Sequence, residues 1–199
     1  MTMKNRISTK FPGQDFLSCS TAEIYIMDYT NQTKNVRGIE WSNVAPADIE
    51  AFFINNLPLL DITFCVFKEN KIKLAGEKEE LPHCEGILFP ANNSGKIWIT
   101  FLELKYPQKR SNLGSELKQA RKQLLFTLDL FRKQGVIEEK QLVYLIFSAP
   151  KYNQKTKYGI PFESWSMEPK ELKEIRKTKY AIMRGINSFH VISNDKIKL

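Results

Sequence analysis

Two short segments of this sequence are apolar on both faces of a strand, and they constrain the fold more than any other feature. Residues 59–68 (LLDITFCVFK) and 141–147 (QLVYLIF) are rich in β-branched and aromatic residues and show little polar–apolar alternation. Such strands are typical of a sheet that is covered on both sides. Both segments therefore look like buried strands, and with the helices predicted below they favour an α/β or α+β architecture.

A long amphipathic helix is predicted between these two strands. Over residues 112–134, apolar side chains recur at spacings of three and four and fall on one stripe of a helix. Gly135 follows the last turn, where glycine commonly ends a helix. A second, strongly charged helix is predicted over 168–184, and another over 46–58, where Pro46 suits a first turn.

Shorter apolar and alternating runs predict the remaining strands. These strands are expected at 22–29, 83–90, 96–106 and 188–193. The second and third are joined by the sequence ANNSG, which is strong turn chemistry. The predicted order is β-α-β-β-β-α-β-α-β, with helices packed on a mixed sheet.

The chain is expected to form one domain, because no linker or repeat divides it. Residues 1–20 and the basic, tyrosine-bearing segment 151–166 are expected to run over the surface as loops. The core is predicted at about 46–150. It is extended by an N-terminal strand and loop at 1–45 and by a C-terminal loop, helix and strand at 151–199.

Charge and composition narrow the classes of partner and compartment. Lys and Arg number 30 against 22 Asp and Glu, and the net charge of +8 favours a polyanionic partner. There is no secretion signal and no apolar run near the ~18 residues of a membrane span, so a cytoplasmic protein without a membrane partner is predicted. Cys19, Cys65 and Cys84 are expected to be free thiols, because they are far apart and no zinc-ligand spacing occurs.

One cluster of charged residues carries the predicted chemistry. Glu103 and Lys105 are two residues apart near the end of a strand, so both side chains point to one face, about 7 Å apart. A hairpin symmetric about Ser94 sets Glu85 directly opposite Glu103. Opposed carboxylates need a proton or a cation between them, and with a lysine they suit a divalent metal and a metal-activated water.

This inference depends on the register of the hairpin. If the pairing shifts by one residue, Glu85 and Glu103 fall on opposite faces, and both are then ordinary solvated strand ends. Asp61, at the start of an earlier strand, is the alternative partner for Glu103.

The order of these motifs resembles the PD-(D/E)xK nuclease superfamily. The resemblance covers residues 46–150: a helix with an acidic residue, three strands, an acid on the second strand, Glu-x-Lys on the third, then a helix and a strand. It implies a restriction-endonuclease-like αβββαβ core, that is, an α/β fold with a mixed central sheet flanked by helices. It also implies hydrolysis of DNA phosphodiester bonds with Mg²⁺, with Mn²⁺ tolerated.

The resemblance assigns roles to matching positions. Glu85 and Glu103 match the metal-binding acids, with the Leu104 carbonyl as a further ligand, and Lys105 matches the lysine that orients or activates the water. Two further roles belong to helices: an additional acid ahead of the three strands, and a polar residue beside the site. The matching residues are Glu50 for the former and Gln119 or Gln123 for the latter.

A basic stripe is expected to contact DNA phosphates. Its members lie before the long helix, on the helix face opposite the apolar stripe, and in the tyrosine-bearing loop: Lys109, Arg110, Lys118, Arg121, Lys122, Lys155 and Lys157. The alternatives are an ordinary solvated face, a degenerate nuclease fold that acts as a nucleic-acid-binding or assembly subunit, and a basic surface for an acidic protein. A homodimer is compatible with each of these hypotheses.

Overall fold

The computed structural model describes residues 1–30, 38–67, 72, 82–91, 95–107, 109–152 and 168–199. Its strands form two mixed sheets, which confirms the predicted α/β class. The six-stranded sheet has the order β1 (Asp15–Cys19), β5 (Ile62–Val66), β6 (Gly86–Pro90), β7 (Thr100–Leu104), β8 (Val143–Ser148), β9 (Ala181–Gly185). The five-stranded sheet has the order β11 (Lys196–Lys198), β10 (Ser188–Ser193), β4 (Phe52–Asn55), β2 (Glu23–Asp28), β3 (Ile39–Ser42).

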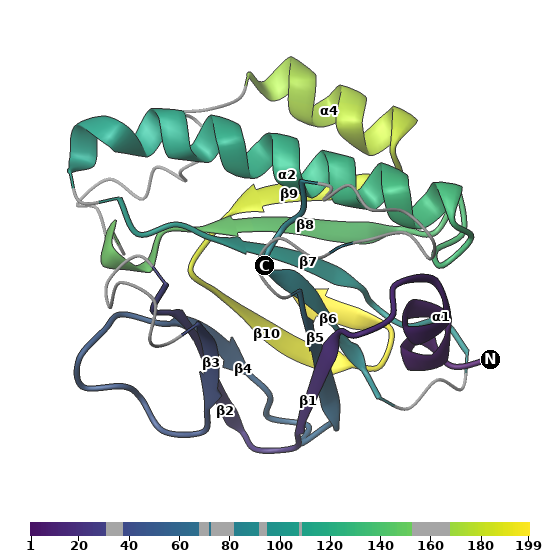
Figure 1. Ribbon diagram of the computed structural model, residues 1–199, viewed down its shortest axis with the longest axis horizontal. Helices are drawn as coiled ribbons and strands as arrows, with labels where there is room; N and C mark the ends of the chain where they lie inside the picture. The colour runs from purple at the N-terminus through teal and green to yellow at the C-terminus, as the bar shows by residue number, and fades with distance from the viewer. Residues whose placement is uncertain (31–37, 68–71, 73–81, 92–94, 108, 153–167) are drawn as a thin grey trace.

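Two helices, α2 (Leu113–Lys133) and α4 (Pro169–Thr178), lie on one side of the six-stranded sheet and the second sheet lies on the other (Figure 1). The N-terminal helix, α1 (Met3–Lys10), adds Met3 and Ile7 to the same core as α2. There are also short 3₁₀ turns, η1 (Arg110–Asn112) and η2 (Pro150–Tyr152). Because each face of the six-stranded sheet is covered, the molecule has three layers and two apolar cores.

The strands predicted to be apolar on both faces are buried on both faces. In β5, Cys65 packs into the core under the helices, whereas its neighbour Phe64 packs into the core between the sheets. In β8, Leu145 and Ile146 divide in the same way. The prediction of buried strands is therefore confirmed, but one of the two covering layers is a sheet, where helices were expected on the flanks of the central sheet.

The prediction of a helix over 46–58 is wrong, because strand β4 occupies the second half of this segment. Phe52 and Ile54 are buried while Phe53 and Asn55 are half-exposed, so the burial has the period of a strand. This segment pairs with β2 and β10, and those long-range hydrogen bonds outweigh the local helix signals. Nothing in 46–51 is helical either.

Two other boundaries differ from the sequence prediction. The charged helix ends at Thr178, well before residue 184, because Ala181–Gly185 forms the edge strand β9 beside β8. Residues 1–20 are not a loop: α1 and β1 lie there, and α1 buries Met3 and Ile7. Phe11 then stacks on Phe131 of α2 with ring centroids 4.5 Å apart, so this extension is part of the core.

The central hairpin and the crossovers position the candidate site. In the β6–β7 hairpin, Gly86 pairs with Leu102 and Ile87 with Phe101, which confirms the register predicted from a turn centred on Ser94. Strands β7, β8 and β9 are parallel, so their carboxyl ends meet at one edge of the sheet. Side chains near the carboxyl end of β7 lie where ligands commonly bind in parallel sheets.

Candidate functional site

Glu103 is a charged residue inside the core, next to the last residue of β7. It lies two residues beyond Phe101, which belongs to the core under the helices, so its side chain points to the α2 side of the sheet. Its exposure is 0%. A carboxylate at this depth needs partners for both of its oxygens, because burial without them is costly.

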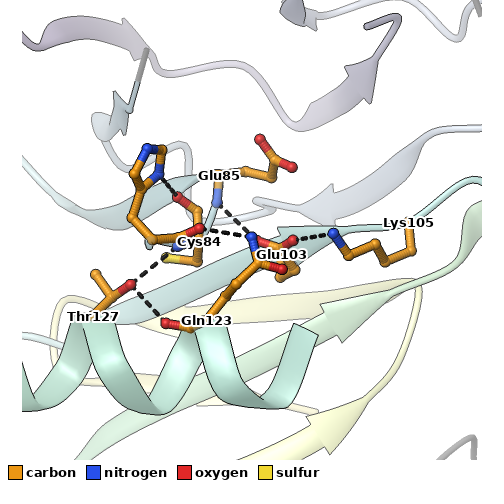
Figure 2. Close-up of polar contacts among 7 residues, drawn as sticks. Cys84, Glu85, Glu103, Lys105, Gln123 and Thr127 are labelled. Carbon is orange, nitrogen blue, oxygen red and sulfur yellow. Dashed lines mark hydrogen bonds and ion pairs between the residues drawn. The ribbon is translucent and has the colours of Figure 1, made fainter. Parts of the chain in front are cut away.

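Lys105 and the backbone of Glu85 supply these partners (Figure 2). The Lys105 Nζ lies 2.6 Å from Glu103 Oε1 and forms an ion pair whose two side chains are 11% and 0% exposed. The Glu85 N–H donates a hydrogen bond of 3.1 Å to Glu103 Oε2. The predicted convergence of Glu103 and Lys105 on one face is therefore present, and Glu85 contacts Glu103 through its amide.

Burial and charge change the proton affinity of both members of the pair. Burial raises the pKa of Glu103 to about 7, although Lys105 and the Glu85 amide hold it down and Asp28 adds a repulsive charge. Burial by itself would lower the pKa of Lys105, but the charges of Glu103, Glu85 and Glu116 leave that pKa raised. Lys105 is therefore a cation, held among several acids, while the Glu103 carboxyl titrates near neutral pH.

The Glu85 side chain extends above the Glu103–Lys105 pair in Figure 2. Glu85 is half-buried and directly precedes β6. The negative charge of its carboxylate is one of the causes that leave the pKa of Lys105 raised. The two glutamates are thus neighbours at one sheet edge, as the hairpin register requires.

Helix α2 holds the segment that carries Glu85 (Figure 2). The Gln123 side-chain amide donates to the His83 carbonyl at 2.9 Å. The Cys84 N–H donates to Thr127 Oγ1 at 3.0 Å, and that hydroxyl donates to the Gln123 carbonyl at 2.7 Å. Gln123, predicted to lie beside the site, therefore positions residues 83–85. On a helical wheel Thr127, like Gln123, flanks the apolar stripe beside the sheet, but no role was predicted for it, because a threonine at the edge of such a stripe has no distinctive signal.

Three other predicted site residues have different surroundings. Gln119 is exposed on α2. Glu50 is exposed and not helical, and its carbonyl, not its carboxylate, accepts a hydrogen bond of 2.9 Å from the Tyr106 hydroxyl. Leu104 is buried between the sheets, so only its carbonyl is a candidate ligand. Asp61, the alternative to Glu85, directly precedes β5. Because Ile62 pairs with Pro90, Asp61 lies at the opposite end of the β5–β6 pair from Glu85 and does not reach Glu103.

The predicted phosphate contacts divide into four groups. Lys109, Lys118 and Lys122 are exposed, as a phosphate-binding stripe requires. Arg121 forms an ion pair of 3.3 Å with Glu171 of α4, so it ties two helices together. The backbone of Arg110 lies in η1. Lys155 and Lys157 lie outside the described residues.

Asp28 is a buried carboxylate near the site that the sequence analysis did not identify. It ends β2, in the second sheet, with 3% exposure, and one of its oxygens accepts from the Thr30 N–H at 2.8 Å. Its charge helps to raise the pKa of Glu103. The one available signal was a lone carboxylate at the end of an otherwise apolar strand.

The arrangement fits a divalent metal only in part. Glu103 offers a buried oxygen that lies 2.6 Å from the Lys105 ammonium, and the second carboxylate is that of Glu85, whose side chain extends above the pair in Figure 2. Hard cations such as Mg²⁺ prefer carboxylate and carbonyl oxygens and retain several waters. Within the described ranges, no group of three or more His, Cys, Asp or Glu residues could hold a metal ion. A metal here would take Glu85, Glu103 and the Leu104 carbonyl, and would complete its shell with water or substrate oxygens.

The sequence matches no family model, and neither the curated proteins nor the solved structures contain a match to it. Among the helices that the structure describes, none is long and apolar enough to cross a membrane.

Proposed function

We propose that this chain is a divalent-metal-dependent nuclease that hydrolyses DNA phosphodiester bonds, as the resemblance to the PD-(D/E)xK superfamily implies. The observation that carries the proposal is the buried Glu103–Lys105 pair at the carboxyl end of β7, with Glu85 beside it. A buried ion pair is commonly no more stable than well-packed apolar residues of the same volume. Chemistry at this edge explains why a carboxylate and an ammonium are buried there.

Each residue has a role that follows from its position. Glu85 and Glu103 would bind Mg²⁺ or Mn²⁺, which would lower the pKa of a bound water and neutralise charge on the phosphate. Lys105 would orient that water and stabilise the negative charge that grows on the phosphate oxygens in the transition state. Gln123 would keep the Glu85 segment in place through the His83 carbonyl.

A second candidate function is favoured by the same ion pair. The Lys105 ammonium already lies 2.6 Å from Glu103 Oε1, where a metal would bind, and the Glu85 N–H uses the other oxygen. A site closed in this way suits a degenerate nuclease fold that binds nucleic acid or assembles with an acidic protein or a second copy of itself. Lys118 and Lys122, exposed on α2, would then contact phosphates without cleavage.

Cleavage with matched variants separates the two functions. Linear duplex, branched and single-stranded DNA are incubated with wild type, Glu103→Gln, Lys105→Met and Lys179→Met, each with Mg²⁺, Mn²⁺, Ca²⁺ or EDTA. Lys179 is the control, because its ion pair with Asp129 has the same 2.6 Å distance but lies on the surface. The fold of each variant is checked by circular dichroism before the assay.

The nuclease proposal predicts cleavage by wild type and Lys179→Met with Mg²⁺ or Mn²⁺ only, and none by the other two variants. Ca²⁺ should bind without supporting turnover, because it is larger and looser in geometry. Equal cleavage by wild type and Lys105→Met would move the active site elsewhere. Salt-sensitive DNA binding without cleavage under any metal would favour the degenerate binding subunit.

A further inference from the structure

The outer face of the five-stranded sheet is a second surface with distinct chemistry. This sheet lies on the side of the molecule opposite α2 and α4 (Figure 1). Its inner face packs against the six-stranded sheet: Phe52, Ile54 and Phe189 belong to the core between the sheets. Phe53 of β4 and His190 of β10, which alternate with these residues, therefore point away from the core. In β2, Tyr25 is partly exposed and packs at the margin of the same core, whereas Met27 is buried.

Two aromatic side chains lie next to each other on this outer face. Tyr25 of β2 and Phe53 of β4 are register partners, and their ring centroids are 5.2 Å apart with planes tilted by 35°. Both residues are partly exposed. The Tyr25 hydroxyl donates to the Glu23 carboxylate at 3.0 Å, which holds the ring in one orientation. Two fixed, partly exposed rings form a stacking platform.

A basic border continues the same face. His190 of β10 is paired with Asn55 of β4 on one side and with Lys198 of β11 on the other, so a polar row runs beside the aromatic pair. Lys196 and Lys198 are exposed, and neither has an ion-pair partner within the part of the chain that the structure describes. The face therefore combines rings for stacking with free cations at one edge.

We propose that this outer face binds a single-stranded nucleic acid, with unpaired bases stacked on Tyr25 and Phe53 and phosphates contacted by Lys196 and Lys198. The rings favour a single strand over a duplex, because bases within a duplex do not expose their flat faces to a protein. The cations at the sheet edge match the negative backbone. The proposal is independent of nuclease activity, since it uses no residue near Glu103.

The test measures the binding of a fluorescein-labelled oligothymidylate of about 15 nucleotides by anisotropy, with EDTA present. The full chain carries Tyr25→Thr, Phe53→Thr or both, because threonine keeps β propensity on an exposed strand. Tyr25→Phe is the matched control, since it retains the ring and removes only the hydroxyl. Melting curves establish that each variant is folded.

Each threonine variant should weaken binding of the single strand by about fivefold to a hundredfold, the range measured for single stacked bases. Tyr25→Phe should bind like wild type. Lys196→Gln with Lys198→Gln should reduce the slope of log affinity against log salt by about 1.4, since two phosphate contacts are lost. Comparing the affinity for an oligouridylate of equal length with that for the oligothymidylate shows whether the face prefers RNA or DNA.

Equal affinity of the folded double threonine variant and wild type for the single strand would overturn the proposal. So would a concentration-dependent dimer in sedimentation that the double variant loses, because the face would then be a contact between two copies. Binding is also measured in the Glu103→Gln background. Unchanged binding there supports a face separate from the catalytic candidate, whatever the cleavage assay shows.

Discussion

Two lysine–carboxylate pairs in this molecule have the same N–O distance, 2.6 Å, and differ in their surroundings. Lys105 and Glu103 are 11% and 0% exposed, inside the sheet edge, whereas Lys179 and Asp129 are 38% and 51% exposed, between two helices. Water screens the surface pair, so its net contribution is small. The buried pair has lost that hydration, so removing one partner leaves an uncompensated charge.

The comparison shows why burial, and not distance, indicates function. A contact of 2.6 Å on a surface needs no explanation beyond two flexible side chains meeting. At the end of β7 the same contact requires that the fold offset the cost of removing two charges from water. The hydrogen bond from the Glu85 amide to Glu103 offsets part of that cost.

The largest difference is expected when each lysine is replaced by methionine. At pH 8, Lys105→Met leaves the buried Glu103 carboxylate without a cation and should lower the free energy of unfolding by about 3–5 kcal/mol. Lys179→Met should change it by less than about 1 kcal/mol, because that pair is screened. Urea unfolding followed by circular dichroism measures both. Equal losses in the two variants would contradict the comparison.

The next largest effect is a dependence of stability on pH. Folding raises the pKa of Glu103 from 4.5 to about 7, so the folded state holds this proton more tightly than the unfolded state. The free energy of unfolding should therefore fall as pH rises through this window, by about 3 kcal/mol from this group, with no further loss above it.

The control for the pH effect is Glu103→Gln, which cannot ionise. Its unfolding free energy, measured in urea at several values between pH 4.5 and 7.5, should lack the decline attributed to Glu103, whereas Lys179→Met should retain it. An identical pH slope in wild type and Glu103→Gln would show that other groups cause the decline.

Metal binding should raise the free energy of unfolding through the buried region alone, by slightly less than the change expected from pH. If Mg²⁺ or Mn²⁺ binds at Glu85 and Glu103, an excess of one hundred times the dissociation constant should stabilise the fold by about 2.7 kcal/mol. Thermal melting measures the shift. Glu103→Gln should lose it and Lys179→Met should keep it. A shift in the Glu103→Gln protein equal to that of wild type would assign the metal to another site.

Local signals were sufficient to predict the central hairpin and the pair on β7. The segment Asn-Asn-Ser-Gly predicted a turn centred on Ser94 and thereby the register that the strands have. The period of two in a strand predicted that Glu103 and Lys105 share one face. Helix α2 was equally clear, because its apolar stripe is long. These features depend on neighbours within about twenty residues of the chain.

Features that depend on distant pairing could not be predicted in this way. Strand β4 pairs with β2 and with β10, which comes more than a hundred residues later, and no local pattern indicates that partner. The same second sheet brings Asp28 near Glu103. The hydrogen bond from the Glu85 amide to Glu103 was also missed, because residue types give no information about which backbone group a side chain meets.

The smallest net change in stability is expected when both members of the buried pair are replaced together. In Glu103→Gln with Lys105→Met, the amide oxygen can still accept from the Glu85 N–H, and no buried charge remains. Its free energy of unfolding should lie within about 1 kcal/mol of wild type or above it, since apolar replacements of buried pairs are often neutral or stabilising. DNA cleavage should nevertheless be lost. A double variant as unstable as Lys105→Met alone would mean that the fold requires the ion pair, and the nuclease proposal would lose its main support.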